Sequence, residues 1–115
     1  MSNGKRKDRT MIDSTDLAAI DANYFDIIGT KDYLVVLRSR NTGHYWSLLE
    51  QEANGHRTFL ISHKHNAADQ FHSQKNKPSI NACCEYIMDH DAFHLDRKRK
   101  QKESRLQRLA AQGQK

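Results

Sequence analysis

Residues 33–63 read YLVVLRS-RNTG-HYWSLLEQ-EANG-HRTFLISH, three runs of β-branched, aromatic and aliphatic residues separated by turn residues. Such runs, bounded by Asn and Gly, are typical of β-strands joined by short turns. Asn54-Gly55 is the strongest turn signal, because a type I′ hairpin turn needs a positive φ at both central residues and Asn and Gly tolerate it. The sequence therefore predicts an antiparallel meander of strands over residues 33–39, 44–51 and 57–63.

Side chains alternate between the two faces of a strand, which assigns the apolar residues of this meander to faces. Trp46 and Leu48 share one face of the middle strand, and Tyr45 and Leu49 share the other. Because both faces carry apolar side chains, we expect a helix to cover at least one of them. We expect one core to contain Leu37, Trp46, Leu48, Phe59, Ile61, Cys84 and Ile87.

Shorter elements flank the meander on either side. Asp13, Ser14 or Thr15 can cap a helix near residues 14–23, and residues 24–28 are compatible with a fourth strand before the turn at residues 29–32. Residues 64–78 are polar and rich in turn residues, so we expect a loop there with at most a short helical turn around residues 67–71.

A long helix is predicted at the C-terminal end. Ser79 is a suitable N-cap, apolar residues recur at helical spacing from Ile80 onward, and no Pro or Gly follows until Gly113. Unbroken over residues 79–112, the helix would be about 50 Å long, and its apolar stripe lapses at residue 97. The fold class is therefore α+β: a short N-terminal helix, an antiparallel three- to four-stranded meander, and a long C-terminal helix with a basic extension that protrudes or frays.

The 115 residues suit one domain of a polar protein, with 37% hydrophobic residues. No apolar run approaches the roughly 20 residues that span a bilayer, so we expect no membrane partner. Cys83 and Cys84 are adjacent on the apolar stripe of the predicted helix, which favours reduced core thiols and a cytoplasmic location.

The charge is distributed unevenly along the chain. Residues 1–10 hold four Lys or Arg and one acid, and residues 97–115 hold eight Lys or Arg and one acid, whereas residues 11–96 hold seven Lys or Arg and twelve acids. This pattern indicates a disordered basic tail over residues 1–10, an α+β core domain over 11–96, and a helical or frayed basic extension over 97–115. Basic ends on an acidic core are typical of proteins that bind an anionic partner.

We therefore predict a non-catalytic accessory module that binds the phosphate backbone of DNA or RNA through its basic ends, since clustered Lys and Arg neutralise phosphates and release counterions. The alternative is a protein-interaction module that docks a partner, such as an acidic protein surface, through its sheet face or C-terminal helix. The residues predicted to contact nucleic acid are Lys5, Arg6, Lys7, Arg97, Lys98, Arg99, Lys100, Lys102, Arg105 and Arg108.

All seven histidines lie within residues 44–94. His63 and His65 share a strand face, and His90 and His94 share a helix face, which are spacings that metal ligands use. Spacing does not establish that the two pairs converge, so we predict no metal and no cofactor. We expect the histidines to gain charge between about pH 7.5 and 6 and thereby to strengthen anion binding.

Enzyme chemistry has little support in the sequence. A thiol on the apolar stripe of a helix is ordinarily inert, and the sequence contains no Gly-rich phosphate loop, serine nucleophile elbow or metalloprotease His-Glu-x-x-His motif. We therefore expect no enzymatic activity.

Overall fold

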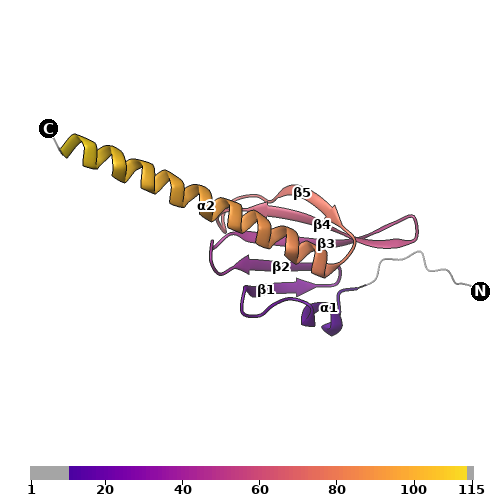
Figure 1. The fold of residues 1–115 in the computed structure, drawn as a ribbon. Helices are drawn as coiled ribbons and strands as arrows, with labels where there is room; N and C mark the ends of the chain where they lie inside the picture. The colour runs from indigo at the N-terminus through magenta and orange to yellow at the C-terminus, as the bar shows by residue number, and fades with distance from the viewer. Residues whose placement is uncertain (1–10, 114–115) are drawn as a thin grey trace, which may run out of the picture.

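The computed structural model of the chain describes residues 11–113. A short helix α1 (Ser14–Ala18) precedes five strands and a long helix α2 (Ile80–Gly113). The strands are β1 (Phe25–Lys31), β2 (Leu34–Ser39), β3 (Tyr45–Ala53), β4 (His56–Lys64) and β5 (His72–Lys77). Figure 1 shows α2 running across the sheet and continuing beyond it toward the C-terminus. The predicted α+β class is confirmed.

The five strands form one antiparallel sheet in sequence order, from β1 at one edge to β5 at the other. The β3–β4 hairpin turns at Asn54 and Gly55, whose φ angles of 54° and 78° are both positive, as a type I′ turn requires. Its register places Ala53 opposite His56, so that Trp46 faces His63 and Leu48 faces Ile61. The meander that the sequence predicts over residues 33–63 is therefore present.

The sheet has five strands, one more than the upper limit of the prediction. Residues 25–31 form β1, as the sequence allowed. Residues 72–77, where a loop was expected, form β5, and residues 67–71 contain a turn but no helix. The prediction failed because β5, with the sequence HSQKNK, has no apolar alternation and is almost entirely exposed. An edge strand is held by backbone hydrogen bonds to its neighbour, here β4, and these leave no hydrophobic signature in the sequence.

Helix α1 begins at the predicted cap but is shorter than predicted. Asp13 is the N-cap: its side chain accepts from the backbone N–H of Asp16, and the Asp16 side chain accepts from the backbone N–H of Asp13. The helix ends at Ala18, before the predicted residue 23. The following residues make turns that bring Ile20 into the core.

The core lies between α2 and the face of the sheet that carries Trp46. All seven residues expected there are buried, with Trp46, Leu37 and Ile87 fully enclosed, and Cys83 and Ile80 of α2 join them. The face turned away from α2 carries a row in which Leu34 pairs with Leu49 and Leu49 with Leu60, all half-buried. Helix α2 therefore covers one face of the sheet.

Helix α2 is much longer than the sheet it covers. Its 34 residues span about 51 Å, whereas the nine residues of β3 span about 30 Å. The Ser79 side chain accepts from the backbone N–H of Ala82 and caps the helix, as predicted. The last buried residue of α2 is Asp91, His94 still contacts His44, and residues 97–113 are all exposed beyond the sheet. No helix within residues 11–113 combines the length and apolar character needed to cross a bilayer.

Candidate functional site

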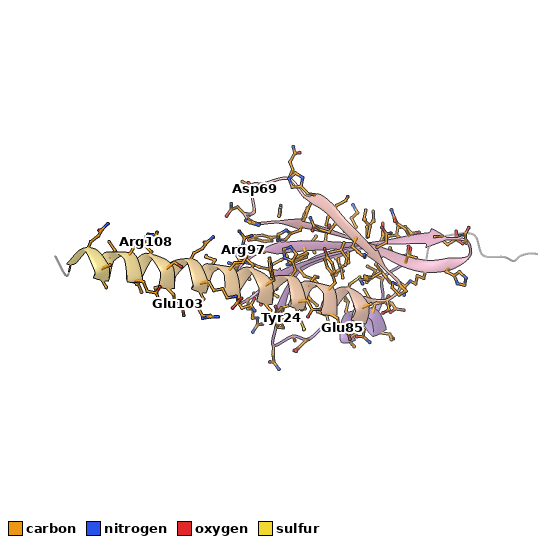
Figure 2. The ribbon with its side chains drawn as sticks, turned by 45° about the horizontal axis from the view of Figure 1, so that its top comes forward. Tyr24, Asp69, Glu85, Arg97, Glu103 and Arg108 are labelled. Atoms are coloured by element: carbon orange, nitrogen blue, oxygen red, sulfur yellow. The ribbon has the colours of Figure 1, made fainter. Side chains whose placement is uncertain are left out.

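The basic residues predicted at the C-terminus lie on the part of α2 that has left the sheet, which we call the arm (residues 97–113). Every residue of the arm is exposed, and Figure 2 shows Arg97, Glu103 and Arg108 along it beyond the sheet. The arm places all seven predicted cations of the C-terminal group on one continuous helix. Lys5, Arg6 and Lys7 lie outside the described residues.

The cations of the arm fall into two groups. Arg99 donates to Asp96 at 2.6 Å and to Glu103 at 2.9 Å, and Lys100 lies 3.2 Å from Asp96. The remaining five cations of the arm make no ion pair within the described part of the chain. Because successive helix residues are rotated by about 100°, these five side chains fall within an arc of about 140° around the helix axis. This set, which we call the basic face, comprises Arg97, Lys98, Lys102, Arg105 and Arg108.

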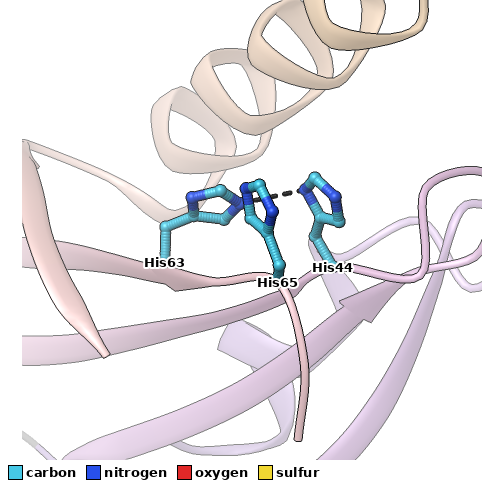
Figure 3. Close-up of side chains that lie close together, drawn as sticks. All are labelled: His44, His63 and His65. Atoms are coloured by element: carbon cyan, nitrogen blue, oxygen red, sulfur yellow. Dashed lines mark hydrogen bonds between the residues drawn. The ribbon is translucent and has the colours of Figure 1, made fainter. Parts of the chain in front are cut away.

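A second cluster of chemically active side chains lies where α2 leaves the sheet. His63 at the end of β4 and His65 just after it meet His44, which directly precedes β3 (Figure 3). One ring nitrogen from each of these three histidines lies within 4.8 Å of the other two. From α2, the His94 ring lies 4.6 Å from the His44 ring and the His90 ring lies 4.9 Å from the His63 ring, between centroids. The two pairs therefore converge, which their spacing alone did not establish.

Two members of this cluster are packed into the core. His44 and His63 are buried, and His63 Nε2 lies 3.0 Å from His44 Nδ1, within hydrogen-bonding distance. The His63 ring stacks on Trp46 at 4.1 Å, and the His65 ring stacks on His44 at 4.1 Å on the exposed side. The cluster thus extends from the core to the surface through stacked rings.

Burial strongly alters the titration of these imidazoles. Burial, with a smaller effect from the neighbouring histidines, lowers the pKa of His44 to about 4 and that of His63 to about 3. Burial and His65 also lower the pKa of His94. The expectation that all seven histidines gain charge between pH 7.5 and 6 is therefore wrong for His44 and His63, because a low-polarity environment disfavours the charged imidazole.

A buried carboxylate holds the helix beside the cluster. Asp91 is fully buried and accepts from the Tyr24 hydroxyl at 2.7 Å and from the Thr42 hydroxyl at 3.2 Å. Thr42 Oγ1 in turn accepts from the backbone N–H of His44. Burial and the Asp91 hydrogen bond both raise the pKa of Tyr24, so its hydroxyl stays protonated and donates. These contacts join the start of β3 to the turn of α2 that carries His90 and His94.

One polar atom beside the cluster has no hydrogen-bond partner among the described residues. It is Nδ1 of His90, which is buried, and buried polar atoms without partners are uncommon because each costs free energy. A pocket opens next to it, between the cluster and the base of the arm. Its lining comprises His65, His90, Phe93, His94, Arg97, Lys98 and Gln101.

The two cysteines lie away from this cluster and are buried in the core. Burial raises the pKa of Cys83 to about 12 and that of Cys84 to about 11, so both thiols are protonated at neutral pH. This agrees with the interpretation of the cysteines as core residues.

Sequence reasoning singled out four of the five clustered histidines and missed the fifth. His44 follows the turn residue Gly43 and has no histidine at a ligand-like spacing, so only the register of β3 against β4 could have placed it beside His63. In comparisons with known proteins, no family model, no curated protein and no solved structure matches this chain.

Proposed function

We propose that this protein is a non-catalytic nucleic-acid-binding module that holds the phosphate backbone of DNA or RNA through the basic face of its arm. The observation that supports the proposal is the separation of charge on the arm. The acids Asp96 and Glu103 pair with Arg99 and Lys100, which leaves the five cations of the basic face available to an outside partner. The reduced thiols fit a cytoplasmic setting, which we propose with it.

The dimensions of the basic face suit a polyanion. Arg97 and Arg108 are 11 residues apart, or about 17 Å along the helix axis. A DNA duplex carries one phosphate charge per about 1.7 Å of its axis, so a duplex of this length carries about ten phosphates on its two strands. A helix about 10–12 Å in diameter also fits a B-DNA major groove about 12 Å wide. The basic face can therefore lie along a duplex with all five cations near phosphates.

A second candidate function is docking of a protein partner by the same arm. Leu106 and Leu109 are 54% and 55% exposed on the arm, and they are large apolar side chains in water. Leu106 lies beside the arc of the basic face and Leu109 lies within it, so a partner with an apolar groove and an acidic rim would use both groups. Binding to an acidic protein surface is the corresponding alternative to nucleic acid.

The experiment compares three variants of the full chain in electrophoretic mobility shifts with duplex DNA, single-stranded DNA and RNA. The test variant carries Lys102→Gln, Arg105→Gln and Arg108→Gln. A charge-matched control carries Lys31→Gln, Arg38→Gln and Lys75→Gln, which are exposed cations of β1, β2 and β5. The third variant carries Leu106→Gln and Leu109→Gln.

We expect the parent to bind with a log–log salt slope equivalent to about four to six phosphate contacts at about −0.9 each on duplex DNA. The arm variant should lower that slope by nearly three contacts and weaken binding at least about tenfold, whereas the sheet variant should stay near the parent. Absence of binding at low salt, or equal losses in the arm and sheet variants, refutes the proposal. A loss confined to the leucine variant also refutes it, because the apolar side chains and not the basic face would then hold the nucleic acid.

A further inference from the structure

We propose that His44, His63 and His65 form a binding site for a divalent transition metal, with zinc as the ion that best suits the set. This site is separate from the basic face and does not rest on the proposed nucleic-acid function. Three imidazoles at the neighbouring ends of β3 and β4 offer nitrogen ligands on one side of the sheet, under the last turn of α2 that contacts it (Figure 3). Imidazole nitrogen is a ligand that zinc, copper and nickel all accept.

The distances fit a tetrahedral ion after small ring movements. Zinc binds imidazole nitrogen at about 2.0–2.1 Å, so two ligands of a tetrahedral site lie about 3.4 Å apart. His44 Nδ1 and His63 Nε2 are 3.0 Å apart, and the farthest pair among the three ligand atoms is within 4.8 Å. His65 is exposed, so its ring can move by the remaining distance, at most about 1.4 Å, without disturbing the core.

The backbone fixes two of the three ligands before any ion binds. His63 lies within β4 and is held by the stack on Trp46, and the His44 backbone is bonded to Ser39 and Thr42 in the β2–β3 turn. Pre-organised ligands lose little conformational entropy on binding. The hydrogen bond between His44 Nδ1 and His63 Nε2 places a proton on one of these two atoms, so when an ion binds both of them that ring must carry its proton on its other nitrogen.

The surroundings also supply what a dication needs. The Asp91 carboxylate is buried beside the cluster and favours positive charge at His44 and His94, which offsets part of the cost of placing an ion there. The pocket between the cluster and the arm leads from the surface to His65 and His94 and provides an entry path. His94 is the nearest ring to His44 from α2, so it or a water molecule completes the coordination.

The test titrates the chelator-treated full chain with zinc and follows the melting temperature, and titrates it with cobalt and follows visible absorption. We expect one ion per chain, a rise in melting temperature of at least about 5 °C at hundredfold excess over the dissociation constant, and the intense absorption of tetrahedral cobalt. His65→Gln is the decisive variant, because His65 is the exposed member of the three and its metal-free melting temperature can be measured alongside. His56→Gln, at the exposed tip of the β3–β4 hairpin, is the matched control.

We expect His65→Gln to weaken zinc affinity at least tenfold while its metal-free melting temperature stays near that of the parent, and His56→Gln to bind like the parent. His94→Gln distinguishes the fourth ligand: a loss of the cobalt spectrum assigns the position to His94, and a retained spectrum assigns it to water. An unchanged melting temperature with excess zinc, or equal affinities of the parent and His65→Gln, overturns the proposed site.

Discussion

Acidification of the metal-free protein should reveal the cost of burying His44 and His63. In the unfolded chain both imidazoles take up protons near their ordinary pKa of about 6.5, whereas in the folded chain the pKa is about 4 for His44 and about 3 for His63. As the pH falls below 6.5, the unfolded state binds protons that the folded state does not. The free energy of unfolding is therefore highest above pH 6.5 and declines as the pH falls to about 3.

The size of the loss follows from the same pKa values. A pH of 5 lies about 1.5 units below the ordinary pKa of histidine, so each imidazole is protonated in the unfolded chain and largely neutral in the folded chain. This difference lowers the free energy of unfolding by about 2 kcal/mol per histidine. The two together should lower the free energy of unfolding by about 4 kcal/mol between pH 8 and pH 5. That is a large part of the 5–15 kcal/mol that stabilises a typical domain.

The charged and titratable groups around His44 and His63 shift the pKa values of this pair in opposite directions. His65, His90 and His94 lower the pKa of His44 and His63, and Asp91 raises that of His44. Asp16 has a lowered pKa because of Arg57, so its contribution to stability is lost only below pH 4. The window from pH 6.5 to 5 therefore isolates the histidines.

The assay is urea unfolding at constant ionic strength with a chelator, at pH 8, 6.5 and 5, alongside NMR titration of the imidazole resonances. His56→Gln is the control, since its side chain is exposed and its loss should leave the pH dependence nearly unchanged. A fall of less than about 1 kcal/mol between pH 8 and 5, or a His63 resonance that titrates near 6.5, would refute the reasoning.

Three further predictions concern the stability of the fold. Arg57→Met removes the ion pairs to Asp16 and to the buried Glu50 and should cost about 3 kcal/mol in urea unfolding. Gly55→Ala places a Cβ at a φ of 78°, with free space around it, so backbone strain alone should cost about 1–2 kcal/mol in the same assay. Ser79→Ala removes the N-cap of α2 and should cost about 1 kcal/mol, with amide exchange accelerated at Ala82.

The parts of the fold that could be predicted are those in which local chemistry and tertiary structure agree. Asn54-Gly55 forms a turn because of its own backbone preferences, whatever the rest of the sheet does. The alternation around Trp46 identifies the core face because α2 covers that face of the sheet. Strand β5 could not be predicted, since its residues pack against little and its pairing is made by the backbone. The end of α1 at Ala18 was missed because Leu17 and Ile20 keep helical spacing while the chain turns between them.

The individual residues of the candidate sites could be predicted from the sequence, but the convergence of the histidines could not. The exposed cations of the arm followed from the sequence, because a helix longer than its sheet must leave it. The convergence of the histidines depends on the register of β3 against β4 and on where α2 crosses them, which are three-dimensional facts. His63 lies opposite Trp46 in that register, and this pairing brings into the core a histidine that the predicted core did not include.

The histidine cluster and the arm meet at the turn of α2 that carries Asp91 and His94. Beyond this turn the helix has no buried residue, so its direction is set by the contacts made there and by the packing before it. Asp91 is hydrogen-bonded to Tyr24 and Thr42, and His94 contacts His44 across the helix–sheet boundary. Apolar packing alone is non-directional, whereas these hydrogen bonds and ring contacts fix both the rotation and the tilt of the helix. The polar residues at this boundary, together with the apolar packing before it, therefore set which way the basic face points.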